Sequence, residues 1–105
     1  MEIIQDVIYR GAVGAKSRVI SVVRRNSCAM QIKYNDENTT PTEVEIKVKA
    51  SLSDMEHRDY SVYTTVSKGG AYIVFPISAT TMIIEITKLA PVGTVATISL
   101  GFTNM

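Results

Sequence analysis

Three short strings in the sequence hold the side-chain types that catalysis or ligand binding needs. The first, GAVGAKS at residues 11–17, has the glycines and the Lys-Ser pair of a phosphate-binding loop. Such a loop needs glycine directly before the lysine, so that consecutive backbone N–H groups surround a phosphate. Here Ala15 precedes Lys16, and a chain of 105 residues lacks room for the α/β domain that carries such loops. We therefore interpret residues 11–17 as a flexible connection between two strands.

The second string, HRD at residues 57–59, matches three letters of the catalytic loop of protein kinases. The glycine-rich loop, the DFG motif and the downstream asparagine of that set are missing from the sequence. A kinase is therefore excluded.

His57 is the single histidine, and Glu56 and Asp59 flank it. Zinc sites use three or four His or Cys ligands, whereas the chain has one of each. Calcium fits slightly better than zinc, because NDEN at residues 35–38 and SDMEHRD at residues 53–59 offer oxygen ligands, but neither segment has the spacing of an EF-hand. A Ser-His-Asp triad would have to use His57, which we predict to be a histidine of a surface loop. We expect no catalytic residue, no metal and no cofactor, and hence no enzyme.

Cys28 is the single cysteine, so an intramolecular disulfide is excluded. It stands among apolar residues of a strand candidate, a setting typical of a small buried hydrophobe. The sequence starts without a basic, then apolar, leader, and no window approaches the roughly 20 apolar residues of a membrane helix. We expect a protein made in a cytosol, with no role in a membrane.

Charge is segregated along the chain, although the formal net charge is +1. Between Val7 and Asn35 there is no acid, and the cations include Arg10, Lys16, Arg18, Arg24 and Arg25. The plain interpretation of these five residues is a solvated basic edge. The functional interpretation is a patch that docks on an acidic protein surface, where charge complementarity steers assembly. Nucleic acid is an unlikely partner, because no aromatic residues interleave with the cations.

The elements that must position these side chains are all strands. Val, Ile and Thr make up roughly a third of the chain, and these residues fit a pleated sheet. No segment keeps helical apolar spacing for three turns. Strands are predicted at residues 3–9, 18–23, 28–34, 43–50, 60–66, 71–75, 81–88 and 94–102. About eight short strands at this spacing indicate an all-β fold, a single antiparallel, jelly-roll-like β-sandwich spanning residues 1–105. Residues 1–25 are either a strand pair or an extended arm.

The clearest strand, residues 43–50, alternates without a break. Val44, Ile46 and Val48 fall on one face, and Glu43, Glu45, Lys47 and Lys49 fall on the other. One dry face and one solvated or partner-facing face are typical of an antiparallel sheet. Further on, SKGG at residues 67–70 predicts a hairpin turn, because adjacent glycines reach the positive φ that tight turns need.

Six motifs follow one another between residues 28 and 102. They are MQIKY (30–34), VKASLSD (48–54), YTTV (63–66), AYIVF (71–75), MIIEIT (82–87) and VGTVATISL (92–100). In this order they resemble small structural proteins of tailed-phage virions. Met55 departs from that family, which usually has glycine there, and Tyr60 takes the place of an aromatic that is commonly Trp. Ile84 stands in a strand where the family often carries Arg.

The resemblance implies a virion component with a jelly-roll or related sandwich, which decorates capsids, builds head fibres or sits along tails. It implies binding to the major capsid protein or other virion proteins, and a homo-oligomer, with a trimer favoured. Our leading hypothesis is a capsid decoration or auxiliary protein that binds and stabilises the coat lattice. The alternatives are a tail or connector component and a glycan-binding attachment module.

Overall fold

A computed structural model describes residues 6–52 and 56–104 of the chain. Its eight strands are β1 (Asp6–Gly11), β2 (Ile20–Ser21), β3 (Arg25–Tyr34), β4 (Glu43–Ser51), β5 (Arg58–Thr64), β6 (Gly70–Pro76), β7 (Thr81–Ala90) and β8 (Ala96–Asn104). The described residues contain no helix, as the absence of helical periodicity predicts. None of these residues therefore belongs to a helix long and apolar enough to span a membrane.

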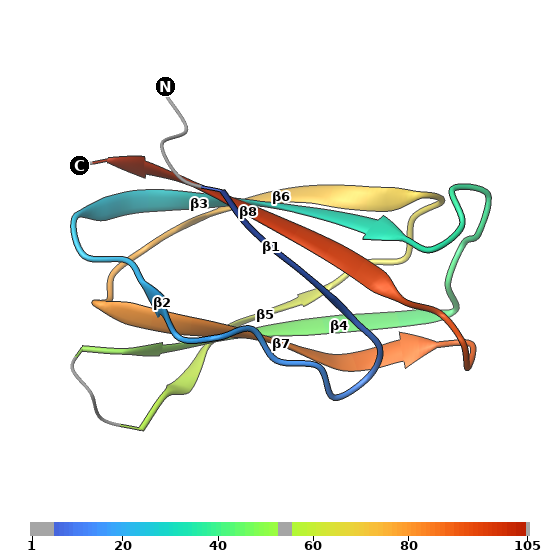
Figure 1. Cartoon of the computed structure of the whole chain (residues 1–105), viewed down its shortest axis with the longest axis horizontal. Coiled ribbons are helices and arrows are strands. Elements are labelled where there is room, and N and C mark those ends of the chain that lie inside the picture. The colour runs from blue at the N-terminus through green and yellow to red at the C-terminus, as the bar shows by residue number, and fades with distance from the viewer. Residues whose placement is uncertain (1–5, 53–55, 105) are drawn as a thin grey trace.

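The strands form two antiparallel sheets of four, stacked face to face (Figure 1). Sheet A has the order β1-β8-β3-β6, and sheet B has the order β2-β7-β4-β5. Successive strands pass mostly from one sheet to the other, so the chain wraps around the core in the manner of a jelly roll. The predicted all-β, jelly-roll-like sandwich is confirmed.

The core lies between the sheets and is built by alternation along the four central strands, interrupted in β7 by a register shift between Ile86 and Lys88. The side chains that point inward are fully buried or nearly so: Cys28, Met30, Ile32 and Tyr34 of β3, Val44, Ile46 and Val48 of β4, Met82, Ile84, Ile86 and Leu89 of β7, and Ala96, Ile98, Leu100 and Phe102 of β8. Burial of this apolar surface is the main driving force for folding such a small domain.

The SKGG turn corrects one prediction. Gly69 and Gly70 do have positive φ values, 79° and 148°. The turn is not a hairpin, however, because β5 belongs to sheet B and β6 to sheet A. The glycines instead allow a crossing between sheets, in which Gly70 lies so close to the carbonyl oxygen of Ile32 that a Cβ would collide with it.

Residues 6–25 contribute to both sheets, and β1 and β2 do not pair with each other. The GAVGAKS string is not a flexible connection. The backbone N–H of Gly14 and Ser17 donate to the carbonyls of Ile86 and Ile84, at 2.8 Å each. The segment therefore runs along β7 as an irregular continuation of the sheet B edge, and residues 1–5 lie outside the described residues.

Candidate interaction surfaces

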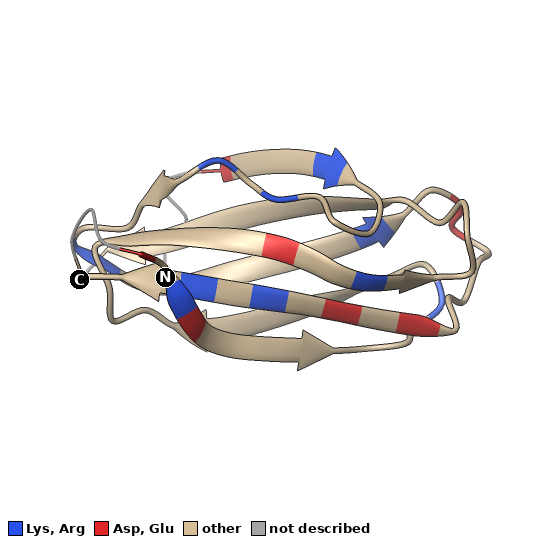
Figure 2. Ribbon diagram, turned by 90° about the horizontal axis from the view of Figure 1, so that it is seen from below, with Lys and Arg blue, Asp and Glu red and all other residues tan. Residues whose placement is uncertain are grey.

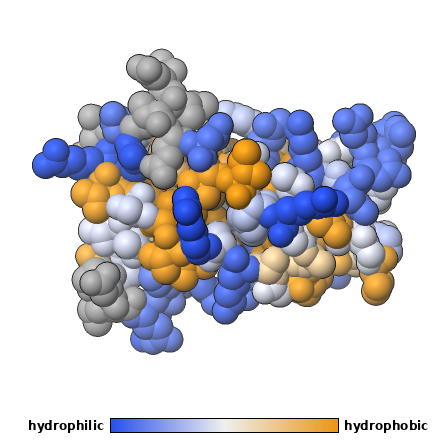
Figure 3. All heavy atoms as spheres, viewed as in Figure 1, coloured by the Kyte–Doolittle hydropathy of each residue, from blue (hydrophilic) through white to orange (hydrophobic). Residues whose placement is uncertain are grey.

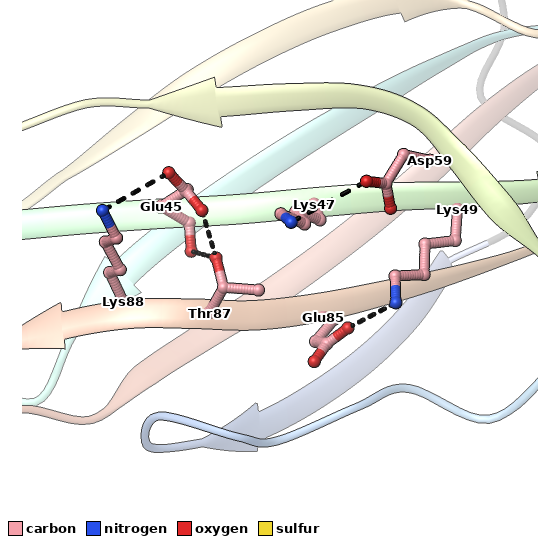
Figure 4. Close-up of polar contacts among 7 residues, drawn as sticks. All are labelled: Glu45, Lys47, Lys49, Asp59, Glu85, Thr87 and Lys88. Carbon is pink, nitrogen blue, oxygen red and sulfur yellow. Dashed lines mark hydrogen bonds and ion pairs between the residues drawn. The ribbon is translucent and has the colours of Figure 1, made fainter.

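The outer face of sheet B carries charged side chains of both signs, and these side chains form ion pairs with one another. Lys49 lies 3.1 Å from Glu85 and Lys47 lies 3.7 Å from Asp59 (Figure 4). Lys88 lies 3.4 Å from Glu43 and 3.9 Å from Glu45. Figure 2, which looks onto this sheet, shows the two signs side by side along the central strands.

A shift in register between β4 and β7 brings Glu45, Thr87 and Lys88 together. Glu45 faces Lys88 and Ile46 faces Ile86, so Thr87 is an extra residue in β7. The Thr87 hydroxyl donates to the Glu45 carboxylate at 2.8 Å. At the other end of the face, the hydrogen bond and charge of Glu85 raise the pKa of Lys49. Charges satisfied within the molecule in this way have little to gain from a partner, so the alternating strand is explained as a solvated face.

The side of the sandwich formed by β1 and residues 12–25 is different, and we call it the β1–β2 side. Among the described residues, Arg10, Lys16, Arg18 and Arg24 form no ion pair. Lys16 and Arg18 line a groove of about 380 Å³ against β1, together with Asp6, Val7, Ile8, Tyr9 and Ser17. The groove lies where the edges of the two sheets face each other.

The five predicted docking residues share this side without forming one cluster. Lys16 and Arg18 meet at the groove, and Arg10 follows on β1. Arg24 and Arg25 lie at the turn into β3. This turn is at one end of the β1–β2 side, and the last residues of β1 are at the other end (Figure 1). The Arg25 guanidinium donates to the side-chain oxygen of Asn104 at 2.9 Å, so this arginine also has a structural role.

Apolar side chains accompany the cations on the β1–β2 side. Ile8, Val13, Val19 and Val23 are each at least 53% exposed. Figure 3, viewed from this side, shows hydrophobic residues gathered in its middle with strongly hydrophilic side chains across them. Exposed apolar area with unpaired charge around it is typical of a protein-binding surface. Sequence reasoning found the cations but missed these apolar residues. Val13, Val19 and Val23 stand outside the strands, where alternation gives no signal, and Ile8 is on the outer face of β1.

Tyr9 lies in the wall of the groove, and among the described atoms its buried hydroxyl has no hydrogen-bond partner. Burial raises the pKa of Tyr9, and the nearby charge of Glu85 raises it further. The phenol is therefore neutral at physiological pH.

The opposite side, formed by the edges of β5 and β6, exposes apolar side chains, and the described charges there stand on β5 and on the loop after it, not on residues 70–75 of β6. On the inner face of this side the rings of Tyr63 and Phe75 pack against each other, with centroids 5.3 Å apart. The Tyr60 hydroxyl donates to the carbonyl of Pro76 at 3.0 Å, joining the two sheets. Outside them, Val62, Val66, Tyr72 and Val74 are exposed. We call this the β5–β6 side.

A hollow of about 200 Å³ lies at one end of sheet B, lined by residues that include Arg58, Asp59 and Tyr60. It is smaller than typical small-molecule pockets. Asp59 pairs with Lys47 and Arg58 lies 3.4 Å from Glu56, so these charges do not converge on the hollow as a binding set. Tyr60 uses its hydroxyl on Pro76.

The residues considered for chemistry are dispersed. Cys28 is fully buried, as predicted, and burial raises the pKa of its thiol to about 12. His57 lies in the loop directly before β5, as predicted, and is half-buried, with its Nε2 2.9 Å from the Thr81 hydroxyl. Within residues 6–52 and 56–104, no three His, Cys, Asp or Glu side chains gather as metal ligands would.

Comparison with known proteins shows a shared fold. No protein-family model and no curated protein sequence matches the chain. Among solved structures, the crystal structure of the SPBc2 prophage-derived protein YomS matches with a TM-score of 0.58. The match covers 98% of this chain and 99% of that one, at 14% sequence identity. The chain thus has, over nearly its whole length, the fold of a protein derived from a phage genome.

Proposed function

We propose that this chain is a structural protein of a phage particle that acts by adhesion and carries out no catalytic step. The observation that carries the proposal is the β1–β2 side, where four cations that form no ion pair with a described residue share the surface with exposed apolar residues and a groove. The fold shared with a prophage-derived protein supports the phage assignment. The leading role is a capsid decoration or auxiliary protein on the coat lattice.

The partner surface that fits the β1–β2 side is acidic, with apolar area of its own. Contacts of the partner with Ile8 and Val19 would bury apolar area. Arg10 and Arg18 would fix the position of the partner on this side and would raise the association rate. Repetition across a lattice then turns many weak contacts into durable attachment, because each further contact of a bound oligomer is effectively intramolecular. Such a protein resides in the virion.

A tail or connector position would use the same surface, so the experiment must separate the two sites. Purified protein is co-sedimented with empty capsids and, separately, with isolated tails of the phage that encodes it. We expect co-sedimentation with capsids that weakens as salt rises, because exposed charges are screened. Binding to tails alone would support the tail or connector role instead of the capsid role. Binding to neither would reject the virion proposal.

Charge reversal locates the contact on the molecule. Arg18→Glu should lower affinity by about tenfold or more, since an attractive charge becomes repulsive at a complementary surface. Lys68→Glu is the matched control, because Lys68 is an exposed cation on the loop between β5 and β6. It should leave binding unchanged. Equal loss in both variants would mean that net charge, not the β1–β2 side, governs attachment.

A further inference from the structure

The free edge of β6 presents backbone groups that nothing in the described structure pairs. β6 is the last strand of sheet A and hydrogen-bonds to β3 on one side. The Ile77 N–H donates to the carbonyl of Asn26 at 3.0 Å, and the register pairs Ser27 with Pro76. In an antiparallel pair, the bonded residues alternate with residues whose N–H and C=O point the other way. The backbone N–H and C=O of Ile73 and Phe75 therefore point toward β3, whereas those of Tyr72 and Val74 point away from the sheet, toward the free edge.

Tyr60 gives independent support for this direction. Pro76 belongs to the outward set, and its carbonyl accepts the hydrogen bond from the Tyr60 hydroxyl, which comes from β5. Proline has no N–H to offer, so the bonding edge ends there. Gly70, Tyr72 and Val74 remain, each with one donor and one acceptor, and Gly70 stands at the crossing between the sheets, so Tyr72 and Val74 form the middle of the edge.

The other edge strands carry devices that discourage pairing with another chain, and β6 carries none before Pro76. Charges, bulges and short length are such devices. β1 holds Asp6 and Arg10, and β2 has two residues. β5 holds Arg58 and Asp59, with a register shift against β4. Residues 70–75 are uncharged, and β6 pairs with β3 without any shift.

The side chains around this edge are also incompletely covered. Tyr72 and Val74 are 63% and 58% exposed on the outer face of sheet A. Ile73 points inward but is only half-buried, although it packs against the core. A strand added beside β6 would cover Ile73 and extend both faces of the sheet.

We propose that β6 pairs antiparallel with β6 of a second copy of this chain, across a two-fold axis at Ile73. Tyr72 then lies opposite Val74 of the second copy, and Val74 opposite its Tyr72, so every outward N–H meets a C=O. A two-fold axis makes this contact self-complementary. Tyrosine beside a β-branched residue is a favourable cross-strand pair, and the two Ile73 side chains cover each other inside. An uncharged edge has no charge to select a different partner, which is why a second copy fits it best.

Hydrogen exchange of the unmodified protein tests the contact residue by residue. The amides of Tyr72 and Val74 should exchange quickly in dilute solution and at least about tenfold more slowly in concentrated solution, where sedimentation should detect a dimer. The Ile73 amide is the internal control, because it bonds to β3 and should be protected at every concentration. A monomer at all concentrations, or an oligomer in which Tyr72 and Val74 still exchange quickly, would overturn the proposal.

Val74→Pro removes an outward N–H without breaking a β6–β3 bond, a change that edge strands accept. It should weaken the dimer by about tenfold or more, whereas Val74→Thr, which keeps the N–H, should not. A dimer as strong in Val74→Pro as in the original chain would contradict the proposed register. A trimer would contradict it too, because a two-fold contact closes after two copies. None of these results depends on binding to capsids or tails.

Discussion

The two sides of the sandwich both expose large apolar side chains and differ in the polar groups around them. On the β1–β2 side the exposed apolar residues stand among four cations that form no ion pair with a described residue. On the β5–β6 side they stand beside the uncharged residues 70–75 of β6. Charge favours a partner of opposite sign, whereas an unpaired backbone edge accepts a strand of the same kind. Hydrophobic exposure alone therefore indicates a contact, and the polar groups around it indicate which partner is bound.

The largest expected effect tests what holds the β5–β6 side together. Gly70→Ala should cost about 3 kcal/mol of unfolding free energy, from positive φ and from collision with the Ile32 carbonyl. Gly93→Ala is the matched variant, because Gly93 has a φ of 95° with open space around it. It should cost about 1 kcal/mol, measured by urea unfolding. Equal costs would mean that the crossing between sheets is looser than described.

Alkaline pH sharpens the comparison through one tyrosine on each side. Burial raises the pKa of Tyr9 and of Tyr63, and Glu85 raises that of Tyr9 further. Above pH 10 the unfolded phenols lose protons that the folded ones keep, so stability falls as pH rises. The slope is at most about 1.4 kcal/mol per pH unit for each group.

Tyr9→Phe should therefore flatten the decline above pH 10 more than Tyr63→Phe does. Urea unfolding at pH 9, 10 and 11 measures the slopes, with the contribution of Cys28 common to all variants. A steeper slope in Tyr9→Phe than in Tyr63→Phe would contradict the deeper burial of the Tyr9 hydroxyl.

At neutral pH the same two substitutions should act in opposite directions. The Tyr9 hydroxyl is buried without a partner among the described residues, so Tyr9→Phe should raise stability by about 1 kcal/mol. The Tyr63 hydroxyl is hydrogen-bonded to Ser61, so Tyr63→Phe should lower stability by about the same amount. Thermal unfolding at pH 7 distinguishes the signs. Destabilisation by both would mean that Tyr9 has a polar partner on the β1–β2 side.

The smallest effect concerns the stability of the charge-reversal variant. Arg18→Glu should change the unfolding free energy by less than about 0.5 kcal/mol, because Arg18 is exposed and forms no ion pair with a described residue. Glu85→Gln should cost more, since it removes the negative charge that lies 3.1 Å from Lys49 on a side chain only 17% exposed. The reverse order, measured by urea unfolding, would show that the cations of the β1–β2 side are structural.

Much of the fold follows from the sequence, because alternation is a local property. Val44, Ile46 and Val48 must share a face wherever their strand lies, and the eight predicted strands overlap the eight observed ones. Alternation does not say which sheet a strand joins, since the inner faces of both sheets need the same residue types. That is why Gly69 and Gly70 were predicted to close a hairpin and in fact connect two sheets.

The surfaces are less predictable for the same reason. The cations Arg10, Lys16, Arg18 and Arg24 are visible in the sequence. That they form no ion pair with a described residue is not visible there, because Glu85 and Asp59 could have folded against them. The edge position of β6 depends on which strands pair, and its uncharged stretch reads in sequence like any core strand. The groove beside Lys16 and Arg18 exists only because residues 14–17 bond to β7.

The most direct test of adhesion through the β1–β2 side is a co-sedimentation titration with capsids, using the original chain, Arg18→Glu and Lys68→Glu. We expect saturable binding by the original chain and by Lys68→Glu, and about tenfold weaker binding by Arg18→Glu. Binding that is the same for all three proteins, or absent for all three, would contradict this expectation.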